Sequence, residues 1–228
     1  MISSEEIVRK LEVNRTNKPR GDILTAKYLI SHGKLKEFPY EKFGSISSSG
    51  IPYHLGAGER GVEFDLKSAE VLVLLIPQPE CFNVLFIKRS DSLSTHAGQV
   101  AFPGGKVEDI DLELSDAAKR ETEEEVGLAP NDIRILGSLD KYLTITGYEI
   151  IPFVGLISSP MHFNPDPNEV SDIFEVPLPF LLDKSNHQKV CRNVNGFSRA
   201  FFAIEYDKYY IWGATAGIVV NLSEVLNS

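Results

Sequence analysis

Residues 104–128 read GGKVEDIDLELSDAAKRETEEEVGL, a Gly-Gly turn followed by an acidic helical pattern. Glu121, Glu124 and Glu125 stand at positions i, i+3 and i+4, which places their carboxylates on one face of a helix. Gly127 follows at the point where a left-handed residue commonly ends a helix. The stretch therefore predicts a helix that follows a tight glycine turn and carries a crowded acidic face.

Crowded carboxylates on one helix face indicate a cation site. Each like-charged pair costs about 0.2 to 0.5 kcal/mol on an isolated helix, and a hard divalent ion reverses that cost because it binds several oxygen ligands. The alternative is a solvated helix face, in which Lys119 pairs with Glu123 and Arg120 pairs with Glu124. The residues alone leave this alternative open; the Gly-Gly turn ahead of the helix and the arginine directly before Glu121 favour the cation site through the known metal-binding signature that they resemble.

The same stretch resembles the Nudix box, the signature of the Nudix hydrolases, usually written G-x5-E-x7-R-E-U-x-E-E-x-G-U with U aliphatic. The half from Arg120 onward matches, except that Thr122 occupies an aliphatic position. The first half is one residue longer than the standard box between Gly105 and Arg120, and Asp111 stands where the spacing calls for glutamate. A loop before the helix tolerates one extra residue.

The residues upstream resemble the coenzyme A diphosphatase branch of that family, which also carries the longer box. Its pattern, roughly L-L-T-x-R-S-x3-R-x3-G-x3-F-P-G-G, fits residues 85–105 with three departures, at Phe86, Ile87 and Ser94. Ser94 replaces an arginine, and serine cannot bind a phosphate through two donors, so we expect a changed affinity or substrate choice. Further resemblance lies in residues 146–148, 168–178 and 211–216, and in all it covers about residues 70–226.

The resemblance implies a set of metal ligands and a catalytic pair. Glu124 and Glu125 match the box positions that hold the metal, with Glu121 one turn earlier and the Gly104 carbonyl as a further ligand. Mg2+ or Mn2+ is the expected ion. Glu121 is also the candidate that accepts a proton from water, and Arg120 is expected to orient it through a charge-assisted hydrogen bond.

Substrate contacts and an acid outside the box complete the predicted site. Arg89 and Gly105 are the substrate-binding candidates, Arg89 because a guanidinium binds phosphate well. Glu169 and Glu175 are candidates for a ligand or base outside the box, and the alternative that they are surface acids stays open. His96 is interpreted as a hydrogen-bonded structural residue rather than a catalyst.

The function implied by the resemblance is metal-dependent hydrolysis of coenzyme A to 3',5'-ADP and 4'-phosphopantetheine. One alternative keeps the chemistry and changes the substrate to ADP-ribose, NADH or a nucleoside triphosphate, and Ser94 keeps this alternative open. Another class of function is a catalytically silent, Nudix-like nucleotide sensor. The intact set of Glu121, Glu124 and Glu125 argues against a silent sensor.

Composition restricts the partners of the chain. The 228 residues are 43% hydrophobic, enough for a globular core, and contain no apolar run of the roughly 20 residues that a membrane helix needs. The formal charge of −9 argues against nonspecific nucleic-acid binding. Residues 1–6 lack a signal-peptide profile, so we expect a cytoplasmic protein with two reduced cysteines, Cys81 and Cys191. The expected partner is a small-molecule diphosphate, and homodimer formation is left open.

The pattern of elements predicts an α/β fold, an α/β/α sandwich around a mixed sheet, as the Nudix resemblance also implies. Ser3 and Glu6 form a capping box before an N-terminal helix. We expect an N-terminal helical extension and irregular linker over residues 1–60 and the Nudix domain over 69–228. Trp212 is expected in the core. Expected helices lie at 21–32, 177–183 and 213–226, an irregular connection at 39–60, and strands at 71–76, 84–88, 98–102, 133–139, 143–157 and 201–212, the last broken at 206–208.

Overall fold

A computed structural model describes residues 2–21, 66–113, 115–144, 147–157, 162–191 and 201–228, and the backbone alone of 51–53, 62–64, 192–194 and 197–200. The helix predicted at 21–32 lies outside the described residues, apart from Gly21. The helices are α1 (Ser4–Asn14), α3 (Asp116–Val126), α4 (Leu178–Leu182) and α5 (Ala214–Asn227), with 3-10 turns at Pro130–Asp132 and Lys184–Asn186. In the described part of the chain, no helix combines the length and the apolar character that crossing a membrane requires.

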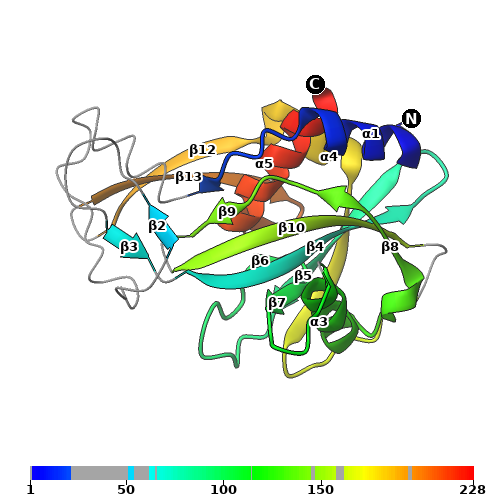
Figure 1. Cartoon of the computed structure of the whole chain (residues 1–228), viewed down its shortest axis with the longest axis horizontal. Helices are drawn as coiled ribbons and strands as arrows, with labels where there is room; N and C mark the ends of the chain where they lie inside the picture. The colour runs from blue at the N-terminus through cyan, green and yellow to red at the C-terminus, as the bar shows by residue number, and fades with distance from the viewer. Residues whose placement is uncertain are drawn as a thin grey trace.

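A mixed sheet forms the centre of the molecule, with α3 on one face and α1, α4 and α5 on the other (Figure 1). Its main path runs β1-β9-β10-β4-β5-β11, while β8 pairs with β10, β7 with β4 and β6 with β5. The predicted α/β class and sandwich architecture are therefore confirmed. The strands are β1 (Arg20–Gly21), β4 (Lys67–Pro77), β5 (Phe82–Arg89), β6 (Val100–Ala101), β7 (Gly104–Lys106), β8 (Ile133–Ser138), β9 (Tyr142–Leu143), β10 (Tyr148–Ile157) and β11 (Val170–Pro177).

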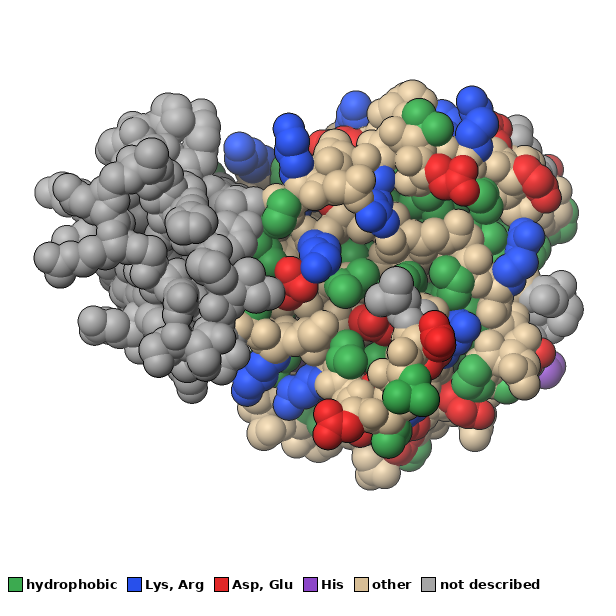
Figure 2. All heavy atoms as spheres, viewed as in Figure 1, with side chains coloured by type: hydrophobic (Ala, Val, Ile, Leu, Met, Phe, Trp, Pro, Cys, Tyr) green, Lys and Arg blue, Asp and Glu red, His purple; other side chains and the backbone are tan. Residues whose placement is uncertain are grey.

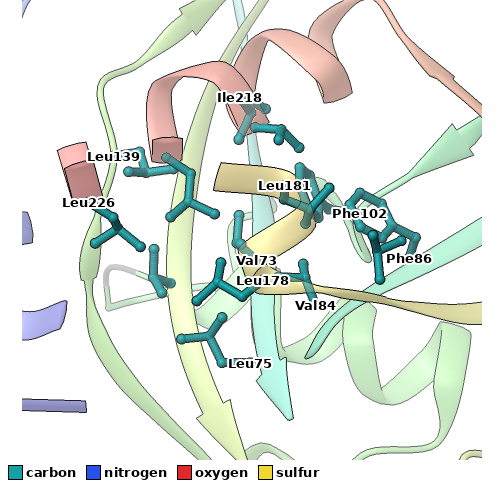
Figure 3. Packing of buried hydrophobic residues seen from close by; sticks show 14 of the residues in the cluster. Val73, Leu75, Val84, Phe86, Phe102, Leu139, Leu178, Leu181, Ile218 and Leu226 are labelled. Carbon is teal, nitrogen blue, oxygen red and sulfur yellow. The ribbon is translucent and has the colours of Figure 1, made fainter. Parts of the chain in front are cut away.

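Strand β4 is apolar along most of its length because both of its faces are covered. Leu72 and Leu74 pack in the cluster on the α3 side, whereas Val73 and Leu75 pack in the cluster that includes α4 and α5. Figure 3 shows the second cluster, with side chains from the sheet meeting those of both helices. This explains why the strand predicted over 71–76 reads as one apolar run rather than as an alternation.

The sheet opens between β4 and β5, and this opening positions the site. The two strands pair only near their connecting turn, from Leu75↔Val84 to Pro77↔Phe82. Farther along, β7 pairs with β4 and β6 pairs with β5. The Gly-Gly stretch therefore lies inside the sheet rather than in a surface loop.

The N-terminal helix is part of the same core. Ser3 accepts a hydrogen bond from the Glu6 amide at 3.1 Å, as expected for an N-cap. Ile7 and Leu11 are buried, and α1 packs against β8 and α5. The division of the chain at residues 60 and 69 stays a prediction.

Three expectations about strands need correction. The strand predicted over 143–157 is two strands, β9 and β10, because the chain turns at Gly147, whose φ is +86°. Within the irregular connection predicted at 39–60, β2 (Ile51–Tyr53) pairs antiparallel with β3 (Val62–Phe64). Strand β11 is missed by the sequence pattern, because polar Ser171 and Asp172 are consecutive, apolar Ile173 and Phe174 are consecutive, and the pairing with β5 shifts register between Val170 and Asp172.

A three-stranded sheet adjoins α5. It consists of β12 (Gln188–Val194), β13 (Phe197–Tyr206) and β14 (Tyr209–Trp212). The turn predicted at 206–208 is confirmed, with Asp207 at a positive φ. The expectation that Trp212 lies in the core is wrong, because Trp212 is 39% exposed. Ile211 is fully buried, and successive side chains of a strand point to opposite faces, so Trp212 points away from the core.

Candidate active site

Both glycines of the Gly-Gly stretch are required by close contacts. Gly104 has φ +144°, and a Cβ there would lie 2.3 Å from the carbonyl oxygen of Glu70. A Cβ on Gly105 would lie 2.3 Å from the carboxylate of Glu121. The bare backbone thus lets the first glutamate of α3 lie directly on β7.

Helix α3 has an unusual start and an ordinary end. Its N-cap, Ser115, has a left-handed conformation and makes no side-chain cap. Buried Glu70, on β4, accepts a hydrogen bond from the Ala118 amide at 3.4 Å and so takes the place of a local cap. At the other end Gly127 is left-handed, as predicted, and its N–H donates to the Glu123 carbonyl.

Glu125 is the buried member of the predicted carboxylate set. Its side chain is 1% exposed, and its Oε2 accepts a 3.0 Å hydrogen bond from the Gly104 amide. Its Oε1 lies 3.4 Å from Nη1 of Arg89. Burial raises the pKa of Glu125 to about 8, with smaller raising contributions from Glu121 and Glu169. The protein therefore holds this carboxylate where a nearby cation would stabilise its charged form.

Arg120 connects the box helix to the loop before it. Its Nε and Nη2 donate to the two oxygens of Asp111, each at 3.1 Å, and Nη2 also donates to the Lys106 carbonyl. Nη1 donates to Glu121 at 3.1 Å and to Glu124 at 3.4 Å. Asp111 has a lowered pKa because of the hydrogen bonds from Arg120. The aspartate at the box position thus fixes Arg120, and Arg120 in turn contacts Glu121, as the sequence predicts.

The three box glutamates have different surroundings. Glu121 is half-buried, and burial raises its pKa despite the Arg120 contact. Glu124 is 58% exposed. Within the described residues, no three carboxylate, histidine or cysteine side chains converge closely enough to form a ready-made metal site. In Figure 2, acidic side chains lie in both the upper and the lower half of the described face, so this view shows no single acidic patch.

Of the two acids considered outside the box, the structure brings only Glu169 to the helix. Residues 162–169 lie along the end of α3, where the Asp166 amide donates to the Glu125 carbonyl. Glu169 is half-buried and close enough to raise the pKa of both Glu121 and Glu125. Glu175 lies farther along β11 and accepts a hydrogen bond from Asn83 at 2.8 Å, beside an open depression of about 500 Å3. The register places it near the β4–β5 turn, away from Glu125.

Arg89 ends β5 directly beside the carboxylates. Its Nε is buried and has no hydrogen-bond partner within the described residues. The loop that follows is closed by a hydrogen bond from the Arg89 amide to the Gln99 carbonyl, and His96 contacts Gln99 at 3.0 Å. Ser94 is exposed in this loop. A buried donor without a partner at the edge of an acidic cluster is what an anionic ligand would satisfy.

The carboxylates around Glu125 are chemically suited to bind a divalent cation. Carboxylate oxygens are the donors that Mg2+ and Mn2+ prefer, and Glu125 is buried beside Glu121 and Glu169, with Arg89 as the cation that the described residues place against it. The Gly104 amide already holds Glu125. The Gly104 carbonyl as a ligand stays a prediction.

The comparison with protein families decides the assignment. The model of the NUDIX domain matches residues 67–190, more than half of the chain. The chain belongs to the Nudix hydrolase family. It is 37% identical over 157 residues to a protein from Escherichia coli strain SMS-3-5 / SECEC named uncharacterized Nudix hydrolase NudL, and the match covers 69% of this chain and 81% of that one. The same values hold for NudL of Escherichia fergusonii.

Solved structures give weaker similarities. The Nudix hydrolase RenU from M. smegmatis is 23% identical, with a TM-score of 0.43, over 51% of this chain and 74% of that chain. The NUDIX domain of Shewanella oneidensis NrtR, solved in complex with ADP ribose, is 21% identical, with a TM-score of 0.41, over 51% of this chain and 76% of that chain.

As a Nudix hydrolase, the chain is an enzyme that cleaves a diphosphate bond in a small molecule, and enzymes of this family generally use divalent metal ions.

The sequence does not predict two features of the site, the contact of Glu70 with α3 and the ion pair of Asp111 with Arg120. Glu70 gave no local signal because it lies 48 residues before its partner. In the sequence Asp111 stands out only as a departure from the box, although an acid nine residues before Arg120 is a signal for the ion pair that the two residues form.

Proposed function

We propose that the chain hydrolyses the diphosphate bond of a nucleoside-diphosphate-linked compound, with coenzyme A as the leading substrate and Mg2+ or Mn2+ as the ion. The observation that carries this proposal is Glu125, a buried carboxylate held by the Gly104 amide beside Glu121 and Glu169. Such a group is costly to bury without a cation. Because Glu125 lies on the helix of the Nudix box, we expect the cation that it binds to take part in diphosphate cleavage.

In this proposal the carboxylates have two roles, metal binding and proton acceptance. Glu121, Glu124 and Glu125, with the Gly104 carbonyl, would hold the cation, which when bound would neutralise phosphate charge and activate water. Glu121 accepts the proton of the attacking water, a role that its raised pKa favours. Arg120, fixed by Asp111, keeps Glu121 in place.

Substrate binding falls to the backbone and to Arg89. The unpaired Nε of Arg89 donates to a phosphate oxygen of the substrate. Gly105 is the backbone candidate for a phosphate contact, and because the Glu121 carboxylate fills the space of its missing side chain, that contact would be made by its main chain. Glu169 is the second candidate for the proton acceptor, since it lies near Glu121 on a separate loop.

The preference for coenzyme A rests on the resemblance of residues 85–105 and 168–178 to the coenzyme A branch. A panel of coenzyme A, ADP-ribose, NADH and nucleoside triphosphates tests it, each with Mg2+, with Mn2+ and with EDTA. We expect coenzyme A to have the highest kcat/KM, with 3',5'-ADP and 4'-phosphopantetheine identified by mass spectrometry. Full activity in EDTA would remove the metal from the proposal. Lack of hydrolysis of every compound would favour the silent sensor.

Ser94→Arg tests the substrate more sharply. A guanidinium at this exposed loop position would add a contact to the substrate phosphates, worth about 1.5 to 3 kcal/mol if formed. Because the ground and transition states share the contact, we expect a lower KM for coenzyme A and little change in kcat. Ser92→Arg, two residues away in the same exposed loop, is the control. Faster turnover of ADP-ribose than of coenzyme A, with no effect of Ser94→Arg, would contradict the coenzyme A assignment.

A further inference from the structure

A tight turn directly before β11 presents Glu169. Its sequence, residues 166–169, is Asp-Pro-Asn-Glu, with aspartate at the first position and proline at the second, which are residues that β-turns favour there. The Glu169 amide donates to the Asp166 carbonyl at 3.0 Å, and the Val170 amide donates to the same carbonyl at 2.8 Å. The Asp166 side chain accepts from the Asn168 amide and from its side-chain Nδ2, both at 2.9 Å. One aspartate therefore fixes the backbone at Glu169.

The turn is docked on the helix that carries the box glutamates. The last carbonyls of a helix have no partner within the helix, and this segment supplies donors for two of them. The Asp166 amide donates to the Glu125 carbonyl at 3.1 Å. Two residues earlier, the Asn164 amide donates to the Val126 carbonyl at 2.9 Å. Asp166 thus contacts the main chain of Glu125 with its N–H and holds the turn with its carbonyl and carboxylate.

Glu169 is also tied to the strand that ends at Arg89. The Ser90 amide, next in the chain, donates to the Glu169 carbonyl at 2.7 Å. On its other side, the charge of Glu169 is close enough to raise the pKa of both Glu121 and Glu125. The main chain of Glu169 is therefore fixed beside Arg89, and its carboxylate is close to both box glutamates.

The Asp166 side chain acts at the turn. Within the described parts of the chain, its hydrogen bonds go to Asn168. We infer that Asp166 is a positioning residue for the hydrolysis, because its side chain holds the turn that keeps the Glu169 carboxylate beside Glu121 and Glu125. The inference rests on the proposed function, in which Glu169 is an acid of the site.

Two substitutions separate the hydrogen bonds of Asp166 from its charge. Asp166→Ala removes the acceptor for Asn168, and we expect kcat for the best substrate of the panel to fall roughly two- to thirtyfold, the factor that corresponds to the loss of one side-chain cap. KM should change little, since Asp166 is not a substrate contact. Asp166→Asn keeps the acceptor and should restore most of the lost rate. Equal losses in the two variants would overturn the inference.

Asp183 offers a matched control. Its side chain accepts from the Ser185 amide, two residues later, at 2.9 Å, as the Asp166 side chain does from Asn168. Asp183 follows α4, which covers the face of the sheet opposite α3. Asp183→Ala therefore removes the same kind of bond away from the carboxylates and should leave kcat unchanged.

A double-mutant cycle tests whether Asp166 acts through Glu169. Glu169→Gln should itself lower kcat, and adding Asp166→Ala should lower it no further, because the carboxylate that the turn positions is already gone. If the two effects instead multiply, Asp166 acts elsewhere and the inference is wrong. An unchanged kcat in Glu169→Gln would overturn it as well.

Hydrogen exchange in EDTA provides a measurement without metal or substrate. The amides of residues 162–170 are held by the turn and by its contacts with α3, so their exchange reports on both. Asp166→Ala should speed exchange in this segment, whereas Asp166→Asn and Asp183→Ala should leave it at the wild-type rate. Wild-type exchange in Asp166→Ala would show that the side chain does not hold the turn.

The outcomes separate this inference from the proposed function. Normal hydrolysis of a diphosphate by the wild-type protein, with kcat unchanged in Asp166→Ala, would overturn the positioning role and leave the proposed function standing. Absence of hydrolysis by the wild-type protein would overturn the proposed function and the positioning role with it. Faster exchange in Asp166→Ala would then mark Asp166 as a residue of the fold alone.

Discussion

At Glu125, burial opposes the charge that the proposed chemistry needs. The side chain is 1% exposed and its pKa is raised to about 8, yet a metal ligand must be ionised. The Gly104 amide and Arg89 offset only part of the cost of burial. Glu123, two residues earlier on the same helix, is exposed, so the two glutamates differ mainly in environment.

This contrast leads to a matched pair of variants. Glu125→Gln keeps the shape of the side chain and an acceptor for the Gly104 amide but removes the charge. We expect turnover with Mg2+ to fall at least about tenfold, without loss of unfolding free energy in EDTA, because a neutral amide costs less to bury. Glu123→Gln should leave both quantities unchanged. Steady-state kinetics and urea unfolding measure them, and full activity of Glu125→Gln would contradict its place among the metal ligands.

Glu121 is distinguished from Glu125 by its expected kinetic effect. Its carboxylate is held by Arg120 over Gly105, where it can act on water. If it accepts the proton, Glu121→Gln should lower kcat while substrate binding persists. Equilibrium binding of the substrate and single-turnover rates separate the two effects. An unchanged rate would contradict Glu121 as the proton acceptor. Glu169 would then be the remaining candidate, and Glu169→Gln would be the variant to measure.

At the scale of elements, the start of α3 depends on a residue of β4. Glu70 accepts from the Ala118 amide where Ser115 supplies no side-chain cap. Burial raises the pKa of Glu70 above its ordinary value of 4.5, so the folded protein releases this proton at higher pH than the unfolded chain. The contribution of Glu70 to the free energy of unfolding therefore falls as pH rises from about 4.5 toward the raised pKa.

Two substitutions separate the cap from the charge. Glu70→Gln keeps the acceptor, and its unfolding free energy relative to wild type should increase from pH 4.5 to pH 7. Glu70→Ala removes the acceptor and should cost about 0.5 to 2 kcal/mol, the range for loss of a helix cap. Urea unfolding in EDTA at both pH values provides the measurement. A pH-independent difference between Glu70→Gln and wild type would show that the carboxylate is not destabilised by burial.

The elements differ in how far the sequence predicts them. Helix α3 was predicted because carboxylate spacing and Gly127 are local signals, and β4 because burial of both faces leaves a continuous apolar run. The sequence predicts one strand over 143–157, because only a single glycine turn, at Gly147, separates β9 from β10. At the site, spacing predicts only that Glu121 and Glu125 share a helix face, and their proposed metal role comes from the resemblance. The contact of Glu70 with α3 depends on how distant strands and helices pack. Thr122, a departure from the box, is accommodated because its hydroxyl donates to the Ala118 carbonyl.

At the scale of the whole molecule, a buried aspartate ties the N-terminal segment to the sheet and to α5. The side chain of Asp140 is fully buried, and it accepts hydrogen bonds from the Thr16 hydroxyl and the Asn17 amide, both at 2.8 Å. It also pairs with Arg20 at 3.1 Å and accepts from Asn221 at 3.2 Å. Segments far apart in the sequence therefore meet at one carboxylate.

Such a junction makes the N-terminal segment part of the cooperative fold. Asp140→Ala leaves the Thr16 hydroxyl, the Asn17 amide and the Asn221 side-chain amide without their acceptor, whereas Arg20 keeps its pair with Glu224. We expect the substitution to lower the free energy of unfolding by about 1 to 3 kcal/mol for each buried donor left unsatisfied. The neighbouring pair of Lys141, whose side chain is 50% exposed, and Glu149 is the control, because an exposed pair contributes only about 0 to 1 kcal/mol.

The control variant is Lys141→Ala, and the readouts are circular dichroism and the fluorescence of Trp212, which lies on β14 rather than on the N-terminal segment. Cooperative unfolding requires both signals of Asp140→Ala to move to lower urea concentration together, since α1 contributes Ile7 and Leu11 to the core that also contains Ile211. If the N-terminal segment only detached, the fluorescence transition would stay at its wild-type midpoint while the helical signal alone shifted. That result would contradict the integration of α1 into the core.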